Sequence, residues 1–261
     1  RFTAIAGLRA DHHNQYRWIA TPRINLKYDV TAETQLRMSA GSGFRTASIF
    51  AENTGLFVSS RQYEIVAPST TYAYGLNPEK AWNYGLNLSH RFELNNRTGS
   101  LSIDAYRTDF SNQTVVDSDT DPQKILFYNL QGQSYANSIQ AELNYELLTK
   151  LDIRLAYRWM DVKTNYSGKL LEKPLVAKNR AFINIAYQTT NQWKFDYTVQ
   201  WFGQKRLPHT SISPASDPTA AYSPSYFQML AQITKQFGKS WDVYIGSENL
   251  TNYKQENLII A

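Results

Sequence analysis

The run Asp117, Asp119 and Asp121 is the part of the sequence whose residue types and spacing come nearest to a metal site. Carboxylates at alternate positions can bind Ca²⁺, but a calcium loop of this type also needs glycine at its sixth position and glutamate at its twelfth. Pro122 and Tyr128 occupy those two positions. We therefore expect three solvated loop carboxylates and no bound metal.

The four histidines are the other candidate ligands for a metal or haem iron. His12 and His13 are adjacent, and adjacent residues of a strand point to opposite faces, so each supplies at most one ligand. His90 follows the apolar positions of its segment and is expected at an interface, and His209 lies in a long polar segment that could contact a metal chelate. No histidine lies at a lumen-facing position beside a nucleophile, and cysteine is absent. We expect no catalytic centre, no cofactor and no enzyme.

The segments that carry these residues alternate between apolar and polar side chains. In WKFDYTVQWFGQK, residues 193–205, every second side chain up to Trp201 is aromatic or aliphatic, which is the period of a β-strand. Many segments of this kind exceed the ~5–6 residues usual for strands in globular proteins. The pattern predicts eleven strands, at 2–13, 18–30, 33–44, 80–93, 99–112, 134–147, 151–165, 179–190, 193–204, 224–237 and 240–253.

Short and long connections alternate along the chain. The longer ones are rich in Ser, Thr, Pro and Tyr and lie at about 45–79, 113–133, 166–178 and 205–223. This asymmetry is typical of outer-membrane barrels, which have short periplasmic turns and long extracellular loops. We therefore expect the apolar face of the strands to meet lipid and the polar face to line a wet interior. A soluble β-sandwich also explains alternation, but it explains the strand lengths and the connections poorly.

Composition sets few further limits. The mean hydropathy is −0.49, and no run approaches the ~18 apolar residues of a membrane-spanning helix. A membrane barrel also averages out as polar, because its two faces alternate. The net charge of +5 comes without long basic runs, so we expect no nucleic-acid partner. The chain starts at Arg1 without a secretory signal, and we interpret it as a mature chain or a piece of one.

Three motifs resemble those of the TonB-dependent outer-membrane receptors. GSGFRTASIFAE at 41–52 and GLNPEKAWNYGLNL at 75–88 flank a long loop, as the GFR and PE motifs of that family do. IGSENLTNY at 245–253 is similar to the asparagine-containing motif of the penultimate strand. The segment 106–143 has the strand–loop–strand spacing of the family. The resemblance covers nearly the whole chain.

The resemblance implies an all-β fold, an antiparallel meander that forms part of a large, 22-stranded transmembrane β-barrel. Residues 1–261 are then a fragment from the C-terminal half of the barrel, with the plug domain and the final strand outside the chain. The implied function is import of a scarce nutrient across the Gram-negative outer membrane with TonB-transmitted energy. A ferric siderophore or similar metal chelate is the commonest substrate of the family, followed by cobalamin, haem and oligosaccharides. A passive porin-type channel and a soluble all-β binding module are the alternatives.

The resemblance also implies that substrate binds the extracellular loops. Cationic and aromatic side chains there suit an anionic, planar chelate. The candidate residues are Arg45, Arg61, Tyr63, Tyr72, Tyr74 and His209, with Phe57 beside them. Arg45 and Glu79 are also expected to brace the ends of their strands. The implied partners are outer-membrane lipid, the TonB complex through the absent plug domain, the chelate and a surface lipoprotein.

Overall fold

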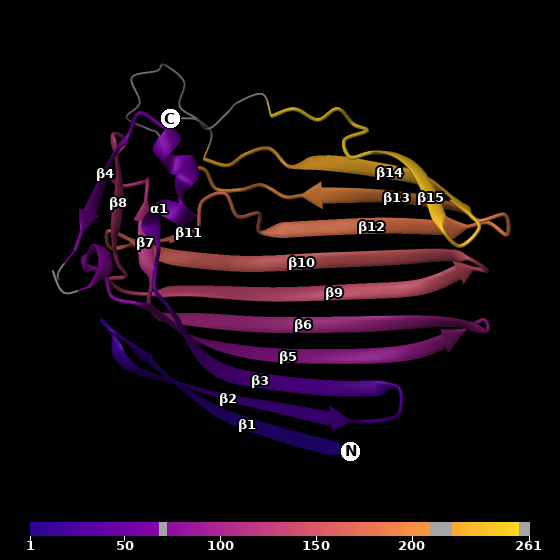
Figure 1. Ribbon diagram of the computed structural model, residues 1–261, viewed down its shortest axis with the longest axis horizontal. Helices are drawn as coiled ribbons and strands as arrows, with labels where there is room; N and C mark the ends of the chain where they lie inside the picture. The colour runs from indigo at the N-terminus through magenta and orange to yellow at the C-terminus, as the bar shows by residue number, and fades with distance from the viewer. Residues whose placement is uncertain (68–71, 209–220, 256–261) are drawn as a thin grey trace.

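The computed structural model describes residues 1–67, 72–208 and 221–255 and confirms the all-β antiparallel meander. In these residues eleven long strands pair in chain order to form one open sheet (Figure 1). Their alternating aromatic and β-branched residues suit a pleated, half-covered surface. The strands are β1 (Phe2–His13), β2 (Arg17–Asp29), β3 (Thr34–Arg45), β5 (Glu79–Leu94), β6 (Arg97–Asn112), β9 (Ser134–Leu148), β10 (Leu151–Tyr166), β12 (Asn179–Gln188), β13 (Trp193–Phe202), β14 (Tyr226–Phe237) and β15 (Trp241–Ser247).

Strands that a short connection joins form antiparallel hairpins. β5 pairs with β6, and β12 pairs with β13, both antiparallel. Asn95 and Asn96, between β5 and β6, have φ of 52° and 58°. Two consecutive positive φ values are the geometry of a type I′ turn, whose twist matches that of the flanking strands, and asparagine tolerates this conformation well.

β15 is shorter than predicted, because the IGSENLTNY motif interrupts its ladder after Ser247, although the chain stays beside β14, where the Leu250 N–H donates to the carbonyl oxygen of Met229 at 2.9 Å. The Nδ2 of Asn249 donates to the carbonyl oxygen of Tyr253, and its Oδ1 accepts from the Tyr253 N–H, both at 3.0 Å. Such local side-chain bonds compete with the ladder of a sheet. The ring of Tyr253 stacks on Tyr226, with 4.3 Å between centroids.

The long segments contain structure that the alternation does not predict. They hold α1 (Ile49–Glu52), η1 (Thr54–Val58), β4 (Gln62–Val66), η2 (Ala73–Gly75), β7 (Thr114–Asp117), β8 (Lys124–Asn129) and β11 (Lys169–Glu172). β4 pairs in parallel with β8, and β8 antiparallel with β7, in a small second sheet, while β11 pairs with β10. No helix in the described ranges is long and apolar enough to cross a membrane.

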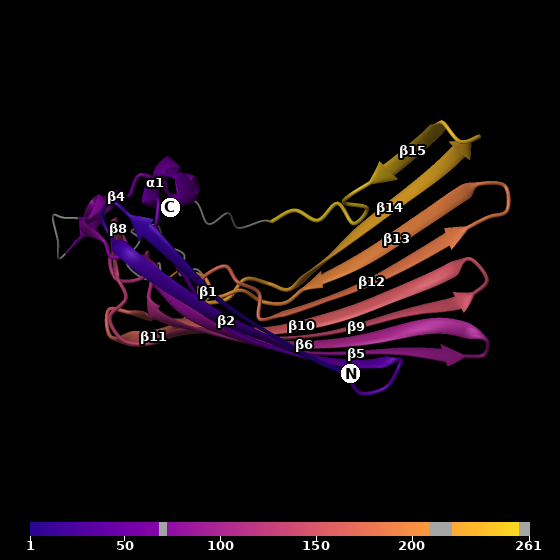
Figure 2. The ribbon, with the colours of Figure 1, turned by 60° about the horizontal axis from the view of Figure 1, so that its bottom comes forward.

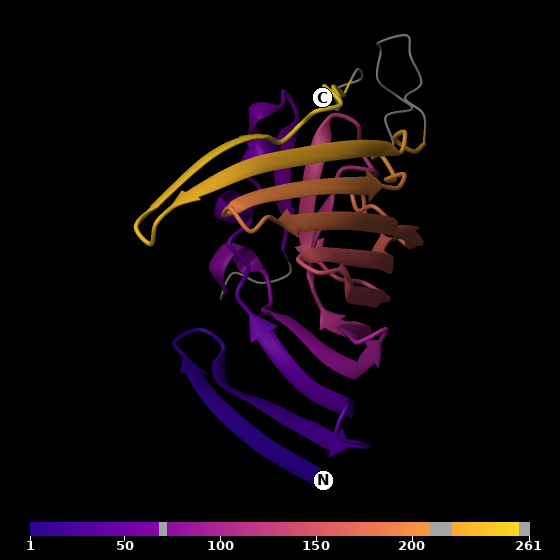
Figure 3. The ribbon, with the colours of Figure 1, turned by 90° about the vertical axis from the view of Figure 1, so that its right-hand side faces the viewer.

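The described parts of the long segments gather at one end of the sheet, and the tight turns lie at the other, as predicted (Figure 1). The sheet is curved, and α1 and β4 lie over its concave side (Figures 2 and 3). Arg45 stands on the polar face of β3 and reaches Glu52 of α1 at 3.0 Å. The polar face of the strands is therefore the concave face.

The apolar side chains form a band on the convex face. Val199 lies opposite Ile183 on one neighbouring strand and Met229 on the other. Large apolar residues of this face are exposed, for example Leu8 at 74% and Val243 at 58%. The clusters of buried apolar residues lie instead among the loop elements. In the described residues no second layer covers the convex face, in contrast to a β-sandwich.

Candidate functional site

A small apolar core at the loop end holds the segments between β3 and β9 together. Ile49, Leu76, Ile125 and Phe127 are buried and pack on each other. They come from α1, from the segment before β5 and from β8. Burying a side chain of this size stabilises the folded state by roughly 1.5–3 kcal/mol. The core therefore fixes the relative positions of loop segments that are far apart in the chain.

Four aromatic residues, Phe50, Phe57, Tyr63 and Tyr74, form what we name the loop aromatic cluster. The ring of Phe50 lies 5.3 Å from Phe57, 5.6 Å from Tyr63 and 5.5 Å from Tyr74, between centroids. Phe57 also stacks on Phe127 of the buried core at 6.3 Å. Tyr63 is 53% exposed and Phe50 39%. The cluster therefore has a firm base and offers half-exposed rings to a flat ligand.

The structure brings some of the predicted site residues together and separates others. Phe57, Tyr63 and Tyr74 belong to the loop aromatic cluster. Phe50, which is not among the residues predicted from the sequence, contacts the rings of all three. Tyr72 is not among these ring contacts, because its ring packs on Tyr16, in the link between β1 and β2, with 4.9 Å between centroids and 36° between the ring planes.

The two predicted arginines have different surroundings. Arg61 donates to the carbonyl oxygen of Ser118 at 3.2 Å, so it joins β4 to the segment after β7. Arg45 pairs with Glu79 at 2.6 Å and with Glu52 at 3.0 Å, which confirms that it braces the end of its strand. His209 lies outside the described residues.

A groove on the concave face begins at Arg45. It has a volume of about 770 Å³ and is lined by residues of β1, β2, β3, β5 and β6. Arg9, Arg23 and Arg45 contribute guanidinium groups to its wall, of which Arg9 is paired with Asp11 at 2.7 Å and Arg45 with Glu79 at 2.6 Å. Since Arg45 also contacts the helix that carries Phe50, the cationic groove and the loop aromatic cluster are linked through α1.

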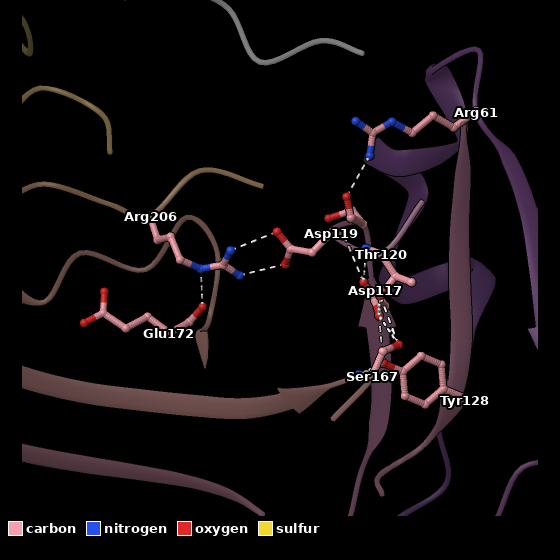
Figure 4. A network of polar contacts seen from close by, with 9 residues as sticks. Arg61, Asp117, Asp119, Thr120, Tyr128, Ser167, Glu172 and Arg206 are labelled. Carbon is pink, nitrogen blue, oxygen red and sulfur yellow. Dashed lines mark hydrogen bonds and ion pairs between the residues drawn. The ribbon is translucent and has the colours of Figure 1, made fainter. Parts of the chain in front are cut away.

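Asp117 is the centre of a polar network among the loops (Figure 4). It is fully buried, and its carboxylate accepts hydrogen bonds from the backbone N–H of Asp119 (2.8 Å), from the Thr120 hydroxyl (2.6 Å) and from the Tyr128 hydroxyl (2.8 Å). Burial alone would raise the pKa of Asp117, but these hydrogen bonds outweigh it and hold the pKa below its usual value. Burial, with the nearby Asp117 carboxylate, raises the pKa of Tyr128 to about 12.

Asp119 forms a bidentate ion pair with Arg206 (Figure 4). The two N–O distances are 2.7 and 2.8 Å, and the side chains are only 6% and 12% exposed. Arg206 Nε donates in addition to the carbonyl oxygen of Glu172. The segment after β13 is thereby joined to β11 and to the segment after β7.

The expectation of three solvated carboxylates is therefore wrong for Asp117 and Asp119. Asp121 accepts a hydrogen bond from the backbone N–H of Gln123 at 2.8 Å. In the described ranges no group of three acidic or histidine side chains is arranged to hold a metal ion. The spacing of the three aspartates in the sequence does not indicate which groups donate hydrogen bonds to Asp117 and Asp119. Several of these donors come from separate segments of the chain: Tyr128, Ser167 and Arg206.

The sheet is curved and antiparallel, with tight turns at one end and loops at the other. Its concave face is polar and its apolar face is uncovered. These features define part of a large transmembrane β-barrel. The sequence model of the family described as TonB dependent receptor-like, beta-barrel, matches residues 1–250. The chain therefore belongs to the TonB-dependent receptor β-barrel family. A search of curated proteins found no matching sequence.

Solved structures of siderophore receptors share the fold. The ferric enterobactin receptor PfeA of Pseudomonas aeruginosa is similar with a TM-score of 0.70 and 16% identity, over 96% of this chain and 37% of its own. The siderophore receptor PirA of Acinetobacter baumannii gives 0.66 and 13%, over 96% of this chain and 39% of its own. The siderophore receptor PiuA of the same organism gives 0.60 and 18%, over 90% and 32%.

These comparisons set the location of the chain and its class. The family places it in the outer membrane of a Gram-negative bacterium, among receptors rather than enzymes. The chain spans between 32% and 39% of the length of the three structures. The sheet of eleven long strands and the short β11 in the described residues is accordingly an open part of a barrel.

Proposed function

We propose that the full-length protein is an outer-membrane receptor that imports a ferric siderophore or a similar metal chelate with energy transmitted by the TonB complex. Residues 1–261 would supply part of the barrel and several of its extracellular loops. The plug domain and the TonB-contacting segment would come from other parts of the full-length protein. Family membership and the likeness to structures of siderophore receptors support this class of substrate.

The observation that carries the proposal is the loop aromatic cluster next to the cationic groove. Many siderophore complexes are anionic and have flat aromatic groups at their surface. Half-exposed rings at Tyr63 and Tyr74 can stack on such groups, and the guanidinium group of Arg23, beside the ion-paired Arg9 and Arg45, attracts the negative charge. A pocket that combines aromatic walls with a few charged groups is typical of small-molecule sites.

Binding to whole cells that carry the full-length receptor tests the site. With a radiolabelled ferric tris-catecholate as the probe, Tyr63→Ala and Tyr74→Ala should each weaken binding by roughly twofold to twelvefold, because an aromatic contact contributes about 0.5–1.5 kcal/mol. Tyr72→Ala is the matched control, since Tyr72 stacks on Tyr16 instead. Equal effects of all three substitutions on binding would show that the loop aromatic cluster is not part of the binding site.

The energy requirement separates active import from a passive channel. Uptake of the radiolabelled chelate should stop in cells that lack TonB, while binding at the cell surface should persist. Uptake that continues without TonB would support a porin and contradict the proposal.

A further inference from the structure

Four tryptophans on the convex face mark the edge of the apolar band nearest the loops. They are Trp18 of β2, Trp82 of β5, Trp159 of β10 and Trp201 of β13. Tryptophan is enriched at membrane–water interfaces, where barrels carry girdles of aromatic residues. The four lie in different rows of the sheet, because the register partners place Trp159 level with Leu86, four residues along β5 from Trp82.

This offset gives the tilt of the strands. From Trp82 to Trp159 the line crosses three strand spacings, about 14 Å at ~4.8 Å each, and descends four residues, about 13 Å at ~3.3 Å each. These lengths give a tilt of roughly 43°, within the ~35–45° of transmembrane barrels. Trp18, two strands before Trp82, and Trp201, two strands beyond Trp159, continue the line. The line therefore follows the extracellular interface of the membrane.

The girdle is interrupted on the two strands between Trp82 and Trp159. These strands are β6 and β9, which lie side by side (Figure 1). The line crosses them at Arg107 and Asn137, which are register partners. The Nη1 of Arg107 donates to the Oδ1 of Asn137 at 3.1 Å. We name these two residues the polar step of the girdle.

A groove of about 480 Å³ begins at the polar step. Its apolar part follows one row of the sheet from Trp159 to Met38. In this row the small Ala105 stands between Leu86 and Ile139, which are large and 43% and 48% exposed. Because the row is oblique to the membrane, its Met38 end lies roughly 13 Å deeper than Trp159. The groove thus descends from the interface into the hydrocarbon, as a lipid chain does.

The side chains around the polar step offer hydrogen-bond donors and acceptors without net charge. Arg107 is paired with Asp109 at 2.6 Å, and the two side chains are 44% and 42% exposed. The amide N–H groups of Asn137 have no acceptor in the described part of the chain. The stacked rings of Trp82 and Tyr84 lie on the neighbouring strand. Planar polar groups beside rings suit a sugar, whose hydroxyl groups both donate and accept.

We propose that this groove binds one glycolipid of the outer leaflet, with a sugar of its headgroup at the polar step and one acyl chain passing over Ala105 toward Met38. The chain leaves one hydrocarbon surrounding for another, so it gains packing but little hydrophobic free energy. Selection of the lipid therefore depends on the headgroup. This site is on the outer wall of the barrel and does not depend on the identity of the imported substrate.

Lipid retention by the full-length receptor tests the site. The receptor is placed in nanodiscs with equal amounts of phosphatidylethanolamine and of lipopolysaccharide that lacks O-antigen, and native mass spectrometry identifies the lipids that stay bound after release. Ala105→Trp fills the groove. Ala141→Trp is the matched control, because it puts the same ring on the same face of β9, opposite Ile103 and outside the groove. Asn137→Ala removes a headgroup donor and leaves the groove open.

We expect Ala105→Trp to retain one lipopolysaccharide molecule fewer than Ala141→Trp, which should match the unaltered receptor. Asn137→Ala should bind that molecule roughly twofold to twelvefold more weakly, the effect of losing one hydrogen bond. Equal retention in the two tryptophan variants, at zero or at any other number, would overturn the site. Retention of phosphatidylethanolamine in place of lipopolysaccharide would overturn the assignment to a glycolipid.

Discussion

The substitution Asp119→Asn tests whether the ion pair with Arg206 holds the loop segments together. It keeps the shape of the side chain but removes the charge that Arg206 faces. Both side chains are nearly buried, so water replaces the lost partner poorly. Removing one partner of a buried ion pair costs about 3–5 kcal/mol. We expect a value near 3 kcal/mol, because Arg206 keeps its hydrogen bond to the carbonyl oxygen of Glu172.

Hydrogen exchange of the full-length receptor measures this cost locally. The amide of Leu175 donates to the carbonyl oxygen of Arg206 at 2.9 Å, and the amide of Leu207 donates to that of Ala221 at 3.0 Å. Both amides exchange when the segment after β13 opens. A loss of about 3 kcal/mol should make them exchange roughly 100-fold faster. Amides in the β5–β6 hairpin are the internal reference and should not change.

A double-mutant cycle decides whether the effect belongs to the pair. Arg206→Met alone leaves the Asp119 carboxylate without its ion-pair partner, so it should also speed exchange. The double variant should lose less than the sum of the two single variants, because neither partner is then left behind. Additive effects, or less than a threefold acceleration in Asp119→Asn, would refute the claim that this ion pair holds the loops together.

Two further predictions concern the membrane face and the Asp117 network. A nitroxide at position 199 of the full-length barrel should be relaxed by a lipid-phase agent, whereas a nitroxide at position 200 should be relaxed by an aqueous agent. If neither agent reaches the label at position 199, Val199 does not face lipid. The pKa of Asp117 is lowered in the folded protein, so its stabilising effect is present above the ordinary value of about 3.9 and is lost as pH falls through the folded value. Limited proteolysis of the loops should therefore increase only in strong acid, and Asp117→Asn should flatten that dependence.

The sequence predicts the eleven strands, their order and the two ends of the sheet because these features depend on local patterns. A period of two assigns the side chains of a strand to opposite faces, and connection length separates turns from loops. The error at β15 has a local cause, since the Asn249 bonds to Tyr253 replace the end of the strand. The alternation of side chains that predicts the strand at 240–253 depends on side-chain polarity and does not register such a turn.

The loop elements could not be predicted in the same way. β4 pairs in parallel with β8, for example Gln62 with Lys124, and such a pairing leaves no trace in either segment alone. Only the structure shows that the candidate residues Tyr63 and Tyr74 meet through Phe50 while Tyr72 packs on Tyr16.

The sequence by itself determined the class of protein, because a membrane barrel needs little more than alternating strands, tight turns at one end and long loops at the other. Tertiary structure alone decided the state of the charges. Asp117 and Asp119 look like solvated loop carboxylates in the chain, yet Tyr128, Ser167 and Arg206 bury them. Whether a charge is solvated or paired depends on which distant groups reach it, because desolvation and hydrogen bonding act over a few ångströms in space rather than along the sequence.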